Sequence, residues 1–163
     1  MTRTTKLVLT TSALVLALYV GRPETANAAG SASAGVLVTA TVSATCTITA
    51  SPLAFGTYDP LGANLSAPKD VNAPLTYACT KSLPATITLD NVGTRVMVNA
   101  GTNLNYDIYT AADYSKVWGT TNTVAVNGTG ASATVNMYGR IPAGQTGLIA
   151  GTYTQTIQAT VNF

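Results

Sequence analysis

The chain has 163 residues, a formal net charge of +2, two cysteines and no histidine. Charged residues make up 9% of it and form no cluster, which argues against nucleic acid or an anionic membrane as a partner, because both need grouped Lys and Arg. Without histidine, a cysteine has no base to activate it as a nucleophile, and two thiols alone make a poor metal site. We therefore expect no enzyme, no metal and no cofactor.

The first 28 residues have the pattern of a cleavable secretory signal. Arg3 and Lys6 form a charged start, residues 7–20 carry no charge, and Ala26-Asn27-Ala28 is a cleavage site of the small-x-small type. The uncharged segment is shorter than the about 20 residues that span a bilayer. We therefore expect an exported mature chain that begins at Ala29, is not inserted in a membrane and has as many acidic as basic residues.

Residues 35–49 alternate between two faces, as a β-strand does. One face carries hydroxyl groups from Thr39 onward, with Leu37 as its apolar exception, and the other face is apolar: Val36, Val38, Ala40, Val42, Ala44, Cys46 and Ile48. The run is much longer than the about 5–6 residues of an ordinary strand. We expect its last part to belong to this chain's own sheet and its first part, to about Val42, to be an arm that completes another sheet. An ordinary first strand of a soluble monomer fits the same alternation.

The rest of the chain shows short alternating segments separated by turns, with no helical periodicity. About six to eight such strands predict a single all-β domain, an immunoglobulin-like β-sandwich. Residues 60–74, rich in Pro, Gly and Asn, are expected to form a loop. Asn127-Gly128 predicts a hairpin between strands near residues 124–126 and 133–138.

The last predicted strand covers residues 153–163 and is apolar at every second residue except Gln155. Its inward-facing residues are Tyr153, Ile157, Ala159, Val161 and Phe163. No later segment of this sequence can pair with its outer edge, so we expect an open edge, which is either an aggregation hazard or a place where another strand docks. An arm at one end of the chain and an open edge at the other predict head-to-tail contacts that build a filament.

Cys46 and Cys79 favour one disulfide, because the chain is expected to be exported to an oxidising compartment. Loop entropy gives such a bond a stabilising effect of about 3–4 kcal/mol.

Other residues that could carry chemistry have ordinary structural explanations. Asp107 and Asp113 are a conceivable carboxylate pair for glycoside hydrolysis, but no catalytic residue is expected. Trp118, Tyr109 and Tyr114 could form a patch that stacks on a sugar, whereas packing in the core or on the sheet surface is the expected role.

Arg140 and three glycines are the remaining candidates for ligand-binding residues. Arg140 could bind an anion or a chaperone, and we expect instead a loop arginine that donates to backbone carbonyls. Gly144, Gly147 and Gly151 are turn residues, because no lysine or helix follows them as a phosphate loop requires.

Motifs distributed over the mature chain carry a family resemblance. The most specific is YGRIPAGQ at residues 138–145. The others are LAFGTYDP at 53–60, LTYACT at 75–80, LNYDIY at 104–109, WG at 118–119, GTY at 151–153 and the closing VNF at 161–163. Together with the Cys46 strand, these motifs resemble the spore coat protein U family and, more closely, the subunits of archaic, Csu-type chaperone–usher pili. Gln155 departs from the pattern, which has an acidic residue after the tyrosine.

The resemblance implies an incomplete immunoglobulin-like β-sandwich that lacks its last strand and is completed by donor-strand exchange. A periplasmic chaperone lends a strand first, and an outer-membrane usher replaces it with the arm of the next subunit. The arm's pocket-filling residues would be Val36, Val38, Ala40 and Val42. The implied organisation is a signal peptide over residues 1–28, a donor-strand arm over 29–42 and a pilin domain over 43–163.

The function implied by the resemblance is that of a structural subunit of a surface pilus that supports adhesion and biofilm formation. Its partners would be identical or related subunits, the chaperone and the usher. One domain with an arm favours a shaft or adaptor subunit over a tip adhesin. A self-complemented secreted coat or matrix protein and a carbohydrate-binding adhesin module remain as alternatives.

Overall fold

The computed structural model describes residues 30–93 and 95–163, so the predicted signal peptide and its cleavage site lie outside the described residues. The chain separates into two units, and the second, Ala40–Phe163, contains all helices and strands assigned in the described part. Within that part, no helix is long and apolar enough to cross a membrane.

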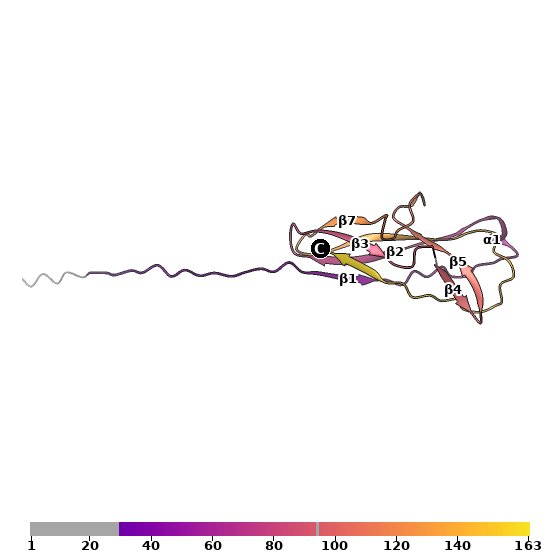
Figure 1. Ribbon diagram of the computed structural model, residues 1–163, viewed down its shortest axis with the longest axis horizontal. Coiled ribbons are helices and arrows are strands. Elements are labelled where there is room, and N and C mark those ends of the chain that lie inside the picture. Colours follow the sequence, from indigo (N-terminus) through magenta and orange to yellow (C-terminus); the bar gives the residue numbers. More distant parts are fainter. Residues whose placement is uncertain (1–29, 94) are drawn as a thin grey trace, which may run out of the picture. The chain divides into compact units, whose positions relative to one another are not determined.

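The described residues form three antiparallel sheets (Figure 1). In chain order the elements are β1 (Cys46–Ala50), α1 (Ala63–Ser66), β2 (Lys69–Cys79), β3 (Pro84–Leu89), β4 (Val96–Asn99), β5 (Thr102–Asn105), β6 (Asp107–Tyr109), β7 (Val124–Asn127), β8 (Ser132–Ile141) and β9 (Ala159–Asn162). A four-stranded sheet has the order β1-β2-β8-β6, a three-stranded sheet has the order β7-β3-β9, and β4 pairs with β5.

The two larger sheets share one hydrophobic core. Leu75 of β2, Ile108 of β6 and Ile141 of β8 come from the four-stranded sheet, Ile87 and Leu89 of β3 come from the three-stranded sheet, and each is at most 2% exposed. Alternation along β2 and β3 turns every second residue into this core, as in a face-to-face sandwich. The prediction of an all-β sandwich is confirmed.

The alternating stretch at residues 35–49 is only partly a strand. β1 pairs with β2 from Cys46↔Cys79 to Ala50↔Leu75, and a disulfide joins the two cysteines as predicted. β2 ends at Cys79, and residues 30–45 have no assigned strand. The part of this stretch that joins the chain's own sheet begins at Cys46, because the ladder with β2 stops at Cys79. The expectation that Cys46 and Ile48 belong to the chain's own sheet is confirmed.

β2 is longer than predicted, because residues 69–74 belong to it and not to a loop. Pro74 favoured the loop prediction, yet its carbonyl oxygen accepts a hydrogen bond from Ser51 N at 3.2 Å. The backbone N and O of one strand residue point to the same side of the strand, so the Pro74 nitrogen points toward the β1 side, as its carbonyl oxygen does. The last β1 residue, Ala50, pairs with Leu75, so no β1 residue lies opposite Pro74. A proline at this position removes no ladder bond. Residues 60–68 remain a connection and contain the short helix α1.

The predicted hairpin at Asn127-Gly128 is wrong, because the strands on its two sides belong to different sheets. The Gly128 backbone bonds to the connection between β2 and β3: its N donates to Leu83 O at 2.8 Å, and its O accepts from Ser82 N at 2.7 Å. A Cβ at this position would overlap the carbonyl oxygen of Thr80. The close backbone approach therefore requires glycine for a reason other than a hairpin turn.

Candidate functional site

β9 is an outer strand of the three-stranded sheet, and its second edge is open. It pairs with β3 from Thr86↔Asn162 to Leu89↔Ala159, and no strand of the described chain pairs with its other side. β9 is shorter than the predicted strand over residues 153–163, because the residues before Gln158 leave β3, and Thr154 bridges to Val98 of β4. An open edge presents unpaired backbone groups that a further strand can use.

The side chains along the C-terminal segment alternate between core and solvent. Tyr153, Ile157, Ala159 and Val161 pack against the core but stay partly exposed. Phe163, expected in the same row, is 60% exposed and lies beside a separate hollow of about 590 Å³ between β3, β7 and the end of β9. These four core-facing side chains therefore remain partly accessible to solvent along this edge.

An apolar groove of about 680 Å³ opens beside the start of this segment. One wall consists of residues 53–58, which follow β1, and the other consists of residues 148–153, which precede β9. Met97, Leu104 and Ile141 lie between the walls. Of the five predicted acceptor residues, Tyr153 lines this groove and the other four do not. The first wall was missed in the prediction, although the alternation of apolar residues in LAFGTY is the signal that could have found it.

Gly139 on β8 lets the first wall pack directly on the sheet. A Cβ there would lie 2.6 Å from Cδ2 of Leu53 and 2.8 Å from Cζ of Phe55, closer than van der Waals contact permits. Tyr58 ties the end of the wall to the loop after β8, since its hydroxyl donates to Pro142 O at 2.8 Å. These contacts join the motifs at residues 53–60 and 138–145 into one wall of the groove.

The second wall is held by side-chain hydrogen bonds. The Tyr153 hydroxyl accepts a hydrogen bond from Ile149 N and donates one to Ile149 O, each at 3.0 Å. Asn99 Nδ2 donates to Ala150 O at 3.4 Å. Because side chains and not a ladder hold residues 149–153, a strand that docks in the groove displaces no existing sheet partner there.

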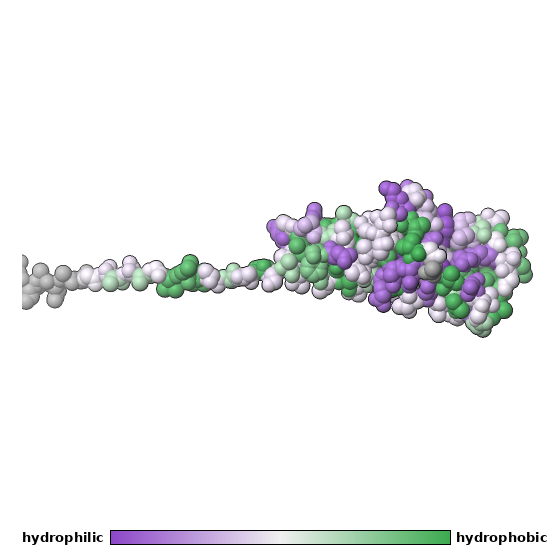
Figure 2. All heavy atoms as spheres, in the orientation of Figure 1, coloured by the Kyte–Doolittle hydropathy of each residue, from purple (hydrophilic) through white to green (hydrophobic). Residues whose placement is uncertain are grey.

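The four predicted donor residues are exposed to solvent. Val36, Val38 and Val42 are 83%, 86% and 82% exposed, and Ala40 is exposed as well. Leu37, on the opposite face of the alternation, is 88% exposed. Figure 2 shows a green, hydrophobic segment within the otherwise paler arm. A contiguous run of exposed apolar side chains is unusual for a soluble chain and marks a segment available to a partner.

Trp118 belongs to the core and to no surface patch. Its side chain is fully buried, and its Nε1 donates to Ile87 O at 2.9 Å. Tyr109 and Tyr114 meet edge to face with ring centroids 5.3 Å apart, and the Arg140 guanidinium lies 3.6 Å from the Tyr114 centroid. The expected core packing of Trp118 is confirmed, and the two tyrosines pack against their neighbours.

The prediction of a loop arginine bound to carbonyls is wrong for Arg140. Arg140 lies on β8 directly opposite Asp70 of β2, and its Nε and Nη2 each donate to a carboxylate oxygen of Asp70 at 2.7 Å. These hydrogen bonds lower the pKa of Asp70 and raise the pKa of Arg140. The residues pair across two strands because β2 is longer than predicted and brings Asp70 into the ladder.

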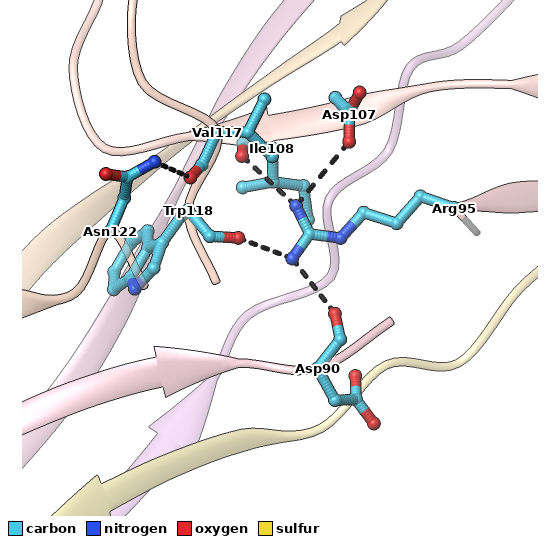
Figure 3. A network of polar contacts seen from close by, with 7 residues as sticks. All are labelled: Asp90, Arg95, Asp107, Ile108, Val117, Trp118 and Asn122. Atoms are coloured by element: carbon cyan, nitrogen blue, oxygen red, sulfur yellow. Dashed lines mark hydrogen bonds and ion pairs between the residues drawn. The ribbon is translucent and has the colours of Figure 1, made fainter. Parts of the chain in front are cut away.

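Arg95, which the sequence analysis did not single out, has the arrangement expected of Arg140. Its side chain is fully buried and donates to the carbonyl oxygens of Asp90, Ile108 and Trp118 (Figure 3). Burial lowers the pKa of this guanidinium. The available sequence signal was a lone arginine directly before an alternating apolar segment in a chain with few charges.

Asp107 and Asp113, the conceivable catalytic pair, have separate partners. Asp107 Oδ1 lies 3.8 Å from Arg95 Nη1, and burial raises the pKa of Asp107. Asp113 accepts hydrogen bonds from the backbone N and the hydroxyl of Ser115 at 3.1 and 3.0 Å, which lower its pKa. Across the residues that the structure describes, no group of three or more Cys, Asp or Glu is arranged to hold a metal ion.

Comparisons with known proteins agree with this fold. A search of curated proteins found no match. Among solved structures, the chain is similar to a chain of the CsuC–CsuE chaperone–tip adhesion subunit pre-assembly complex, from archaic chaperone–usher Csu pili of Acinetobacter baumannii, with a TM-score of 0.56 and 22% identity. The match covers 76% of this chain and 40% of that chain, so the protein spans less than half the length of its structural neighbour.

At this identity the likeness shows a shared fold, which agrees with the predicted immunoglobulin-like sandwich. The family model of the Spore Coat Protein U domain matches residues 32–160, nearly the whole described chain. The protein therefore belongs to the Spore Coat Protein U domain family.

Proposed function

We propose that this protein is a structural subunit of a surface pilus of the chaperone–usher class, in which the arm of one subunit completes the open sheet edge of the next. The observation that carries the proposal is the open edge of β9, together with an apolar groove beside residues 148–153 that precede it, in a chain with an exposed apolar arm. Addition of a strand would use the edge and the groove together, because its backbone hydrogen bonds to the edge supply affinity and its alternate side chains fill the groove.

The topology disfavours completion of the sheet by the chain's own arm. Figure 1 shows the start of β1 and the C-terminal end of β9 at the same end of the folded unit, with α1 at the opposite end. The register agrees, since Cys46 pairs with the last residue of β2, and Asn162 pairs near the start of β3. An arm that leaves at this end must reverse to lie along its own β9, and residues 39–45 contain no Gly, Pro, Asn or Asp to make the turn.

An arm from a second subunit avoids this reversal. If it runs antiparallel to β9, it enters at the Cys46 end of the acceptor and leaves at the end that holds α1. The donor's folded unit then follows, with its own Cys46 end facing the α1 end of the acceptor. This contact is head-to-tail and leaves one free edge and one free arm, so it repeats into a filament. A parallel arm would place two like ends together and stop the growth.

Burial of the arm supplies the driving force. Val36, Val38, Ala40 and Val42 would move from water into the groove and along β9. Complete burial of the three valine side chains contributes up to about 4.5–9 kcal/mol, and the Ala40 methyl adds about 0.8 kcal/mol. Ordering of the arm and loss of subunit mobility offset part of this gain.

The open edge needs a temporary cover before assembly, and a periplasmic chaperone supplies it until an outer-membrane usher exchanges it for the arm of the next subunit. The similar solved structure is itself a complex of a chaperone with a tip subunit, which supports this step. The assembled pilus lies at the cell surface, where it supports adhesion and biofilm formation. This role is structural and not enzymatic, and it needs no cofactor.

Two neighbouring substitutions in the arm test the proposal. Val38→Asp would bury an unpaired carboxylate in the groove, so we expect no SDS-resistant polymer when it is expressed with its chaperone and usher. Leu37→Asp is the matched control, because residue 37 lies on the opposite face and stays in water, and its polymer should equal that of the wild type. Equal periplasmic amounts of the two variants exclude an export defect. Wild-type polymer levels from Val38→Asp, or equal losses from both variants, would overturn the donor-arm assignment.

A further inference from the structure

Arg95 is a buried cation that the proposed polymerisation leaves unused. Its Nη1 donates to Ile108 O at 3.1 Å, and its Nη2 donates to Trp118 O at 2.6 Å and to Asp90 O at 3.0 Å (Figure 3). The nearest carboxylate is that of Asp107, whose Oδ1 lies 3.8 Å from Nη1. Three carbonyls from three segments of the chain therefore share one guanidinium, and one of them comes from the end of β3.

The Asp90 carbonyl is taken out of the β3–β9 ladder by this contact. The last ladder pair is Leu89↔Ala159, and Asp90 and Gln158 come next. Asp90 N donates to Gln158 O at 3.0 Å, as a ladder requires. The return bond would run from Gln158 N to Asp90 O, but this oxygen accepts from Arg95, and Gln158 N donates to the side-chain Oδ1 of Asp90 at 2.7 Å. The side chain replaces the carbonyl, and the ladder ends at this pair.

Beyond Gln158 the C-terminal segment changes its partner from β3 to β4. Thr154 and Val98 exchange backbone hydrogen bonds of 3.1 and 3.4 Å, and Arg95 directly precedes β4. Tyr153, beside this bridge, lines the apolar groove, and so does Met97 of β4. Arg95 thus bonds to Asp90, which holds the segment at Gln158, and directly precedes β4, which holds the segment at Thr154. The groove lies beside residues 148–153, in front of the Thr154 bridge.

We propose that Arg95 and Asp90 are positioning residues that end the β3–β9 ladder at Gln158 and let Thr154 bridge to Val98 of β4, so that the groove stays open for the arm of a second copy of this chain. This inference rests on the proposed function and adds the feature that sets the speed of strand exchange. When the acceptor edge is already ordered, binding of the arm does not include the entropic cost of ordering that edge.

The test measures how fast a fluorescent peptide of residues 30–45 replaces the chaperone on the chain from which the signal peptide has been removed, and compares Asp90→Ala with Asp90→Asn. Asp90→Ala removes the acceptor for Gln158 N, and we expect uptake to be slower by about tenfold, because the edge must be ordered during binding. Asp90→Asn keeps a side-chain oxygen at this position, and its uptake should be within about twofold of the wild type. Thr154→Pro removes the hydrogen bond to Val98 O at the other support and should slow uptake as well.

Thermal midpoints of all variants separate positioning from stability. Slow uptake by Asp90→Ala or Thr154→Pro at a temperature where the variant is still folded supports the inference. Uptake as fast as in the wild type, or a loss in proportion to the unfolded fraction, overturns it while the proposed function stands. A wild-type chain that takes up no peptide overturns the proposed function and this inference together.

Discussion

The disulfide between Cys46 and Cys79 joins the first residue of β1 to the last residue of β2, with the two Cα atoms 4.1 Å apart. Cys46 lies four residues after the end of the arm, and β2 lies between β1 and β8 in the four-stranded sheet. A tensile force on the arm is therefore transmitted through the Cys46–Cys79 disulfide to β2, an inner strand of the sheet. In a filament held together by arms, tension enters each subunit at this point.

Replacement of both cysteines, Cys46→Ser with Cys79→Ser, should lower the free energy of unfolding by about 3–4 kcal/mol, because the unfolded chain is no longer cross-linked. Urea unfolding of the processed chain measures the change. The wild type under a reductant is the matched control and should unfold at the same urea concentration as the double variant. Equal midpoints for the oxidised wild type and the double variant would contradict the prediction.

Trp118→Phe should lower the free energy of unfolding by at least about 1–3 kcal/mol, because the substitution leaves the buried carbonyl of Ile87 without its donor. The smaller ring adds a cavity cost. Tyr109→Phe is the control, since it removes a hydroxyl from a partly exposed ring and should change stability by less than about 0.5 kcal/mol. Similar urea midpoints for the two variants would show that the Trp118 hydrogen bond contributes little.

Asp70→Asn should lower stability by up to about 1 kcal/mol at about pH 7, because the pair with Arg140 is partly exposed and screened. Arg140 holds the native pKa of Asp70 below that of the unfolded chain. This stabilisation is therefore complete above the unfolded pKa of about 3.9 and is lost as the pH falls through the lower native pKa. Urea unfolding of both proteins between about pH 7 and pH 2 should show the difference shrinking with acid, and a constant difference would be evidence against the ion pair.

Gly139→Ala should weaken both the subunit and its uptake of the arm peptide, because the new Cβ meets Leu53 and Phe55 and pushes the first wall away from β8. A destabilisation of about 1–3 kcal/mol is expected from such overpacking. Gly35→Ala is the control, since a Cβ there meets no atom within 4 Å, and it should leave urea unfolding unchanged. An unchanged urea midpoint for Gly139→Ala would mean that the first wall can move away from β8 without lowering the free energy of unfolding.

The local sequence pattern was sufficient to predict several structural features of this protein. Alternation at residues 35–49 predicted that its last part, with Cys46 and Ile48, joins the chain's own sheet, and the only two cysteines of the chain pair as expected. Pattern failed where a residue's partner was distant in sequence. Gly128 resembles a hairpin glycine, but its backbone bonds to the β2–β3 connection, more than 40 residues away. Pro74 resembles a loop residue, but it lies where β1 has already ended.

The sequence by itself determined that the chain is an all-β protein with an apolar face on its arm and another on its last segment, because a period of two is a property of each strand alone. Only the tertiary structure decided which strands are neighbours, that Arg140 meets Asp70, and that Arg95 diverts the Asp90 carbonyl from the ladder. The groove likewise consists of segments almost 100 residues apart in the chain. Such contacts depend on how the two sheets stack, and no short stretch of sequence contains that information.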